Sequence, residues 1–149
     1  MSERYQLEAA YARTLLPLSR KWRQFADRAM SDMGVSAAGG WALVQVGRLG
    51  DDVRQSDLAA HLDITGPSLV RVVDQLVDAG LVERRRDPVD ARVSRVGFTE
   101  SGRALATRIE SAFGELRREI LADVTDTDLA TALRVAEHLE ACFAQPRRP

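Results

Sequence analysis

Hydrophobic residues recur at steps of three to five positions through about residues 7–33, and this spacing predicts a helix. Pro17 falls inside the pattern. Because proline lacks a backbone donor, it either begins the main helix in its first turn or kinks a longer one. Gly34 closes the segment, and Ser36 is a suitable N-cap for a second helix that runs to about Leu49.

Two short helices separated by a tight turn are predicted next, over about residues 55–62 and 65–79. Thr65 can cap the second of them, and Pro67 lies in its first turn, where a missing N–H has no cost. The apolar positions of this helix fall on one side. They leave a polar set that faces outward: Ser68, Arg71, Asp74, Gln75 and Asp78.

The pattern then changes to two predicted strands, residues 81–86 and 93–98, joined by a turn at 87–91. A long helix follows from about Thr99, with apolar positions continuing to Val124. A last helix carries apolar positions as far as Phe143, and Gln145 and Pro146 are expected to end it.

This order of elements predicts a fold that is mainly α with a small β hairpin. We expect a single domain over residues 1–149, in which residues 36–98 form a winged helix-turn-helix. The long helices at the two ends, residues 1–33 and 103–145, would form a dimerisation region. Their apolar positions exceed what one chain of this length can cover, which favours a homodimer over an ordinary core. The expected interface residues are Leu7, Tyr11, Leu15, Leu116, Ile120, Leu129, Leu133, Leu139 and Phe143.

Composition changes this picture little. The 149 residues are 45% hydrophobic and 29% charged, as in an ordinary globular protein, and no apolar run is long enough for a membrane span. No secretory signal pattern is present at the N-terminus, so a cytoplasmic location is expected. The net charge of −1 does not support nucleic-acid binding. However, charge is segregated, because Arg84, Arg85 and Arg86 are consecutive and Arg92 and Arg95 follow them, and phosphates respond to the local patch within about 8 Å.

A helix-turn-helix followed by a basic hairpin suits duplex DNA, because a helix fits the major groove and its outward residues reach the base edges. Arg71 has the bidentate fork that matches guanine. A wing arginine at position 92 could enter the adjacent minor groove. Of the three consecutive arginines, only one or two can face the DNA backbone, because neighbours on a strand point to opposite faces. The expected DNA contacts are Gln55, Ser56, Thr65, Gly66, Pro67, Ser68, Arg71, Gln75, Arg86, Asp90 and Arg92.

From Gln55 to Gly102 the sequence resembles the MarR regulators, and the SlyA branch in particular. The matching motifs are Pro67-Ser68-Leu69-Val70-Arg71, Asp74-Gln75-Leu76, Gly80-Leu81-Val82, Asp90 with Arg92, and Phe98-Thr99 to Gly102. The resemblance implies a homodimer whose terminal helices interlock. Its two recognition helices would bind successive major grooves of a pseudo-palindromic operator. The resemblance further implies a repressor that small aromatic acids release from the DNA. It also implies that Asp90 braces Arg71. One departure is Ala91, where many members have the first of two wing arginines, and its effect on wing affinity is left open.

A ligand pocket formed by Arg20, Trp22, Arg23 and Trp41 is one interpretation of the first two helices, since cations and indoles suit an aromatic carboxylate. The other is that both tryptophans belong to the core. His138 and Cys142 have metal-ligand spacing, but two ligands do not make a site, so neither a metal nor another cofactor is expected. No nucleophile with a base and no phosphate loop is visible, so the chain is not expected to be an enzyme. A winged helix that binds protein and not DNA is the remaining alternative.

Overall fold

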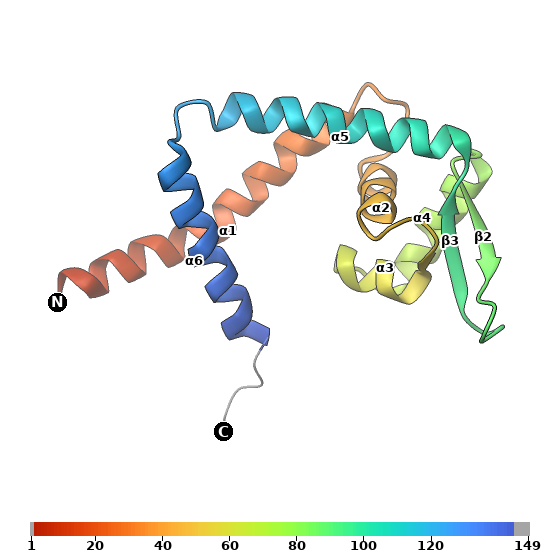
Figure 1. Cartoon of the computed structure of the whole chain (residues 1–149), viewed down its shortest axis with the longest axis horizontal. Coiled ribbons are helices and arrows are strands. Elements are labelled where there is room, and N and C mark those ends of the chain that lie inside the picture. Colours follow the sequence, from red (N-terminus) through yellow and green to blue (C-terminus); the bar gives the residue numbers. More distant parts are fainter. Residues whose placement is uncertain (1, 145–149) are drawn as a thin grey trace. The chain divides into compact units, whose positions relative to one another are not determined.

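The computed structural model describes residues 2–144, and the chain divides into two compact units, Met1–Leu116 and Arg117–Pro149. Figure 1 shows the elements in chain order. They are α1 (Glu3–Met30), α2 (Ala37–Arg48), β1 (Val53–Arg54), α3 (Gln55–Leu62), α4 (Gly66–Asp78), β2 (Val82–Arg86), β3 (Ser94–Phe98), α5 (Glu100–Ile120) and α6 (Asp126–Ala144). The expectation of a mainly helical winged-helix fold is confirmed.

The first helix begins earlier than its apolar pattern suggested. Ser2 caps α1 by accepting a hydrogen bond from the Tyr5 N–H at 3.3 Å, and Pro17 lies within one continuous helix. Only the C-terminal end of α1 joins the core, through Ala26 and Met30. The preceding turns of the helix are therefore exposed along nearly their whole length.

Helix α2 lies at the centre of the first unit. Ser36 caps it as predicted, with its hydroxyl accepting the Gly39 N–H at 3.1 Å. Its buried residues pack against α1, α3, α4 and β3, and the first half of α5 passes over it (Figure 1). Fully buried side chains from these elements form one core, which includes Met30, Leu43, Leu58, Leu69, Val96 and Ile109.

The sheet has three antiparallel strands in the order β1-β3-β2, whereas the sequence predicted only the β2–β3 hairpin. Val53 of β1 pairs with Val96, and Val82 of β2 pairs with Phe98. Two-residue β1 is too short to show an alternating pattern, so only its pairing with β3 identifies it as a strand. It ties the segment before α3 to the base of the hairpin.

Helix α5 packs unusually closely against the chain that precedes β2. Thr99 caps the helix by accepting the Gly102 N–H at 3.0 Å, and the Thr99 N–H donates to the Leu81 carbonyl. A Cβ atom at position 102 would lie 1.7 Å from the Leu81 carbonyl oxygen. Position 102 therefore requires glycine, because any side chain would collide with the Leu81 backbone. This accounts for Gly102 in the Phe98-Thr99 to Gly102 motif.

In the second unit, Thr125 caps α6 by accepting the Asp128 N–H at 3.1 Å, and none of the residues of α6 is buried. The predicted stop at Gln145 and Pro146 lies outside the described residues. Of the described helices, none combines the length and the apolar character needed to cross a bilayer.

Candidate nucleic-acid interface

The N-terminus of α4 is held by Thr65. The Thr65 hydroxyl accepts the Ser68 N–H at 3.3 Å and donates to the Ser68 hydroxyl at 2.9 Å. Gly66 and Pro67 are exposed in the first turn, and a Cβ atom added at Gly66 would meet nothing within 4 Å. This end of α4 is thus open to a large partner.

The outward face of α4 has the polar character that the sequence predicted. Arg71 and Gln75 are exposed, and within residues 2–144 neither side chain makes a hydrogen bond or an ion pair. Leu69, Val73 and Leu76 are buried on the opposite side. The burial of that stripe sets the rotation of α4 and leaves both polar side chains available.

Helix α3 carries two of the predicted DNA contacts, Gln55 and Ser56. Gln55 is half-buried, and its side-chain oxygen accepts a hydrogen bond from Arg84 Nε at 3.3 Å. Ser56 is exposed. Of these two predicted contacts, Gln55 is engaged within the protein and Ser56 is open to solvent.

The three consecutive arginines of β2 have different environments. Arg84 turns toward the helices, and its Nη1 lies 2.5 Å from Asp74 Oδ1. Arg85 pairs with Glu83, which lies two positions away on the same side of the strand. Arg86 is exposed and has no ion-pair partner among the described residues. Arg84 and Arg86 belong to one side of β2 and Arg85 to the other, and among residues 2–144 only Arg86 of the three has no partner.

The wing lies between β2 and β3 and extends away from the helices (Figure 1). The side chain of Arg92 is 91% exposed there, with Nε 3.1 Å from Asp90 Oδ1 and Nη2 3.3 Å from Oδ2. Hydrogen bonds from Arg92 lower the pKa of Asp90. The expected Asp90–Arg71 contact is wrong, because both carboxylate oxygens of Asp90 hold Arg92 instead.

Asp87 anchors the base of the wing. It is 5% exposed, and its Oδ1 accepts the N–H groups of Val89 and Asp90 at 2.9 and 3.1 Å. Its Oδ2 accepts Arg95 Nη1 at 2.9 Å, with Arg54 Nε 3.7 Å away. The two backbone hydrogen bonds, followed by the bond from Arg95, lower the pKa of Asp87 to about 2.

The sequence suggested that Arg95 adds to the basic surface. In the structure Arg95 instead links Asp87 to the turn before β1. It also donates to the Asp52 carbonyl at 2.7 Å and to Asp52 Oδ2 at 3.1 Å. The aspartate before Pro88 was a signal for such a loop anchor, since aspartate at the start of a turn bonds the backbone two residues on.

A second anchor lies at the turn after α2. Asp51, with φ of 59°, accepts the Phe98 N–H at 2.8 Å and pairs with Arg103 of α5. Burial raises the pKa of Asp51, but the bonds from Phe98 and Arg103 outweigh it and lower the pKa overall. The turn, β3 and α5 are joined at this carboxylate.

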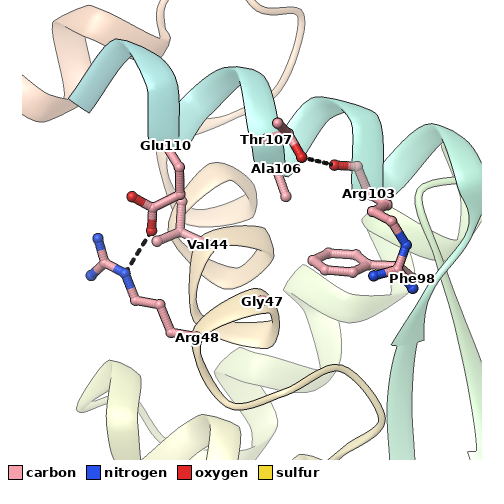
Figure 2. A pocket seen from close by; sticks show the side chains of 8 residues that line it. All are labelled: Val44, Gly47, Arg48, Phe98, Arg103, Ala106, Thr107 and Glu110. Atoms are coloured by element: carbon pink, nitrogen blue, oxygen red, sulfur yellow. Dashed lines mark hydrogen bonds and ion pairs between the residues drawn. The ribbon is translucent and has the colours of Figure 1, made fainter. Parts of the chain in front are cut away.

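A cavity of about 370 Å³ lies beside this anchor, between α2 and α5 (Figure 2). Arg48 Nε lies 2.7 Å from Glu110 Oε1 at one end, and Phe98 lies at the other with Arg103 over its ring. None of the four residues predicted for a ligand pocket lines it.

Those four residues lie elsewhere. Trp41 Nε1 donates to Asp27 Oδ1 at 2.7 Å, its ring lies 5.1 Å from that of Phe113, and Arg23 covers it at 4.6 Å. Trp22 is 37% exposed and Arg20 is exposed. The polar edge and one face of Trp41 are thus occupied within the protein, as the core interpretation implies.

In α6, the Cys142 sulfur lies 3.6 Å from His138 Nε2. Across residues 2–144 no three potential ligands gather closely enough to hold a metal ion. The pair is a local contact on an exposed helix.

Residues 33–93, which include α2, α3, α4 and most of the wing, match the model of the MarR family. This segment, which carries the helix-turn-helix, is therefore similar to the MarR family. That family consists of transcription regulators.

Solved structures share this fold over almost the whole chain. Transcriptional regulator PA3341 is 28% identical, with a TM-score of 0.82 over 89% of this chain and 97% of that one. MarR family transcription regulator SP03579 is 26% identical, with a TM-score of 0.81 over 95% and 93%. A mutant MarR from E. coli, complexed with operator DNA, is 23% identical, with a TM-score of 0.75 over 93% and 99%, and shows the shared fold.

Proposed function

We propose that this protein is a transcription repressor that binds a pseudo-palindromic operator in duplex DNA as a homodimer. The observation that carries the proposal is the exposed polar edge of α4, where Arg71 and Gln75 have no side-chain partner among residues 2–144. The wing of the same unit bears Arg86 and Arg92. A relative of the same fold was solved with operator DNA, which supports the same partner here.

In this proposal α4 enters the major groove. Thr65 fixes its first turn, Gly66 and Pro67 allow close approach, and Ser68 bonds a base or a phosphate. Arg71 offers two parallel donors to guanine, and Gln75 reaches the next base pair. The wing crosses the backbone, and Arg92 at its exposed tip enters the minor groove, with Asp90 setting its direction.

The proposal of a dimer rests on the exposed apolar side chains of the terminal helices, which the described residues of the chain do not cover. Leu7 is 64% exposed on α1, and Leu133 and Phe143 are 57% and 78% exposed on α6. Such stripes on long helices are covered in stable proteins, and a second copy of this chain is the partner that a closed two-fold assembly requires. Tyr11, Leu15, Ile120 and Leu129 are exposed as well. Leu116 and Leu139 are half-buried, and Leu116 packs against the core of its own chain, so its part in the interface is the smallest.

Selection of bound duplexes from a random pool tests the proposal most directly. A dimer with two α4 helices should recover a palindrome whose half-sites are about one helical turn, 34–36 Å, apart. Binding should weaken steeply with salt, because about eight phosphate contacts per dimer give a log-log slope near −7. No enrichment, or enrichment without symmetry, would contradict the proposal. No enrichment would favour a winged helix that binds protein.

Repression and release are parts of the same proposal. A dimer seated on promoter DNA competes with polymerase for the same surface, so deletion of the protein should raise transcription from a reporter that carries the selected site. Release by a small aromatic acid, and closeness to the SlyA branch, are predictions from the resemblance. Salicylate added to the protein–DNA complex tests the first, with benzyl alcohol as a neutral control.

A further inference from the structure

One guanidinium connects the wing strand to both helices of the helix-turn-helix. Arg84 of β2 pairs through Nη1 with Asp74 of α4 at 2.5 Å, donates through Nη2 to the Val70 carbonyl at 3.3 Å, and donates through Nε to Gln55 of α3 at 3.3 Å. Bonds between a guanidinium and a carboxylate are about twice as strong as neutral ones, so Asp74 is its main partner.

Asp74 also has a second possible partner. It lies three positions after Arg71 on α4, and residues at this spacing are neighbours on a helix surface. The Asp74 side chain is 52% exposed, so it has room to change rotamer. Yet the Asp74 carboxylate is bonded to Arg84, and Arg71 has no ion pair anywhere in residues 2–144.

We propose that Arg84 determines the base preference of α4 by holding the Asp74 carboxylate, which would otherwise capture Arg71 and withdraw it from the DNA. Arg84 is thus a positioning residue that acts through Asp74 and Arg71. The proposal rests on the proposed function, because it assigns Arg71 to base recognition.

The surroundings of Arg84 distinguish this role from an ordinary phosphate contact. All three of its nitrogens already donate to protein oxygens, and the side chain is 33% exposed. Arg86, two positions on, belongs to the same side of the strand and keeps its guanidinium unoccupied. A phosphate beside β2 would therefore meet Arg86, while Arg84 stays bound to the helices.

A double-mutant cycle tests the proposal, with the duplex selected by the wild-type protein and a scrambled duplex as probes. Arg84→Gln should weaken binding to the selected duplex about tenfold, as expected for loss of one bidentate base contact. Binding to the scrambled duplex should change less than twofold. Adding Asp74→Asn should return affinity for the selected duplex to within about threefold of wild type, because the amide carries no charge with which to hold Arg71.

Arg85→Gln is the matched control. It removes the same charge from the same strand, but Arg85 pairs with Glu83 and does not contact α4. It should lower affinity for both duplexes alike. Arg84→Lys retains a charge for Asp74 and should stay within about threefold of wild type, which covers the case in which Arg84→Gln does not fold.

Two results would overturn the proposal. One is a double variant as weak as Arg84→Gln alone. The other is a log-log salt slope reduced by about 0.9 for each Arg84 removed, which would mean that Arg84 contacts a phosphate directly.

A measurement without DNA separates this proposal from the proposed function. The Nε–H resonance of Arg71, assigned with Arg71→Lys, should shift in Arg84→Gln and return in Arg84→Gln/Asp74→Asn. If the wild-type protein selects no duplex, the proposed function fails, and an unmoved Arg71 resonance would still refute its capture by Asp74.

Discussion

In the helices of the winged helix-turn-helix, Leu58, Leu69 and Val73 are completely buried, whereas on the terminal helices Leu7, Leu133 and Phe143 are more than half exposed. Both regions follow the same helical spacing of apolar residues. The apolar stripes of the winged helix-turn-helix are covered by their own chain, whereas those of the terminal helices are exposed. Hydrophobic spacing therefore identifies a face that needs a partner, but it does not say whether the partner is the same molecule or another copy.

The polar groups of the two regions differ in a similar way. At the base of the wing, Arg95 donates to both Asp87 and Asp52, and Asp87 also accepts two backbone N–H groups of the loop. In α6, the described side chains make only local contacts, such as Thr131 with the Thr127 carbonyl. The winged helix is stabilised within the monomer, and the following predictions test whether the terminal helices depend on a second chain.

The largest effect is expected in the core. Leu69→Ala should lower the free energy of unfolding by about 2–5 kcal/mol, because it empties a fully buried site on α4. Urea denaturation at fixed protein concentration measures this. Val70→Ala, at a neighbouring side chain that is 40% exposed, should cost less than about 1 kcal/mol. Equal effects of the two substitutions would mean that α4 is not packed as described.

Leu133→Asp should dissociate the proposed dimer and weaken operator binding about a hundredfold or more, since linkage of two binding modules contributes 10²–10⁴ to affinity. Sedimentation velocity and fluorescence anisotropy report the two effects. Thr131→Asp adds the same charge to the opposite side of α6 and should leave both unchanged. A Leu133→Asp protein that remains dimeric and binds normally would remove α6 from the interface.

Arg71→Ala should cost about 1–3 kcal/mol in operator binding and relax the base preference at one position of each half-site. Arg92→Ala should weaken selected and scrambled duplexes alike, because a wing arginine in the minor groove reads little sequence. Competition binding with single-base operator variants measures both. If each variant bound as the wild type does, α4 and the wing would not be the DNA-reading elements.

The smallest effect is the loss of wing stability at low pH, when Asp87 is protonated. The pKa of Asp87 falls from 3.8 to about 2 on folding, so the ionised carboxylate stabilises the folded wing above about pH 4. That stabilisation is lost as the pH decreases toward 2, when Asp87 is protonated in the folded state as well. Hydrogen exchange of the Val89 and Asp90 amides between pH 5 and 2 should show the loss. Asp87→Asn should lack this pH dependence, and an identical profile in the two proteins would assign the effect to other carboxylates.

Much of the fold could be predicted because local chemistry marks it. Ser36 and Thr65 cap the helices that the sequence assigned to them, and the apolar stripe of α4 separates Arg71 and Gln75 from the core. Strand β1 could not be predicted, because its two residues become a strand only by pairing with β3. The ion-pair partner of each arginine in the hairpin could not be predicted either. Arg84, Arg92 and Arg95 are the same residue type and differ only in the carboxylate that lies beside each.

The sequence by itself determined the order of the elements, the helix caps and the polar edge of α4, because each depends on residues within a few positions of one another. Only the tertiary structure decided that Arg95 holds the wing and that Arg84 holds Asp74. Each of these contacts joins charges from different elements or loops, which meet only after folding. Residues 36–98 contain eight arginines and eight aspartates, and proximity in space selects which of them pair.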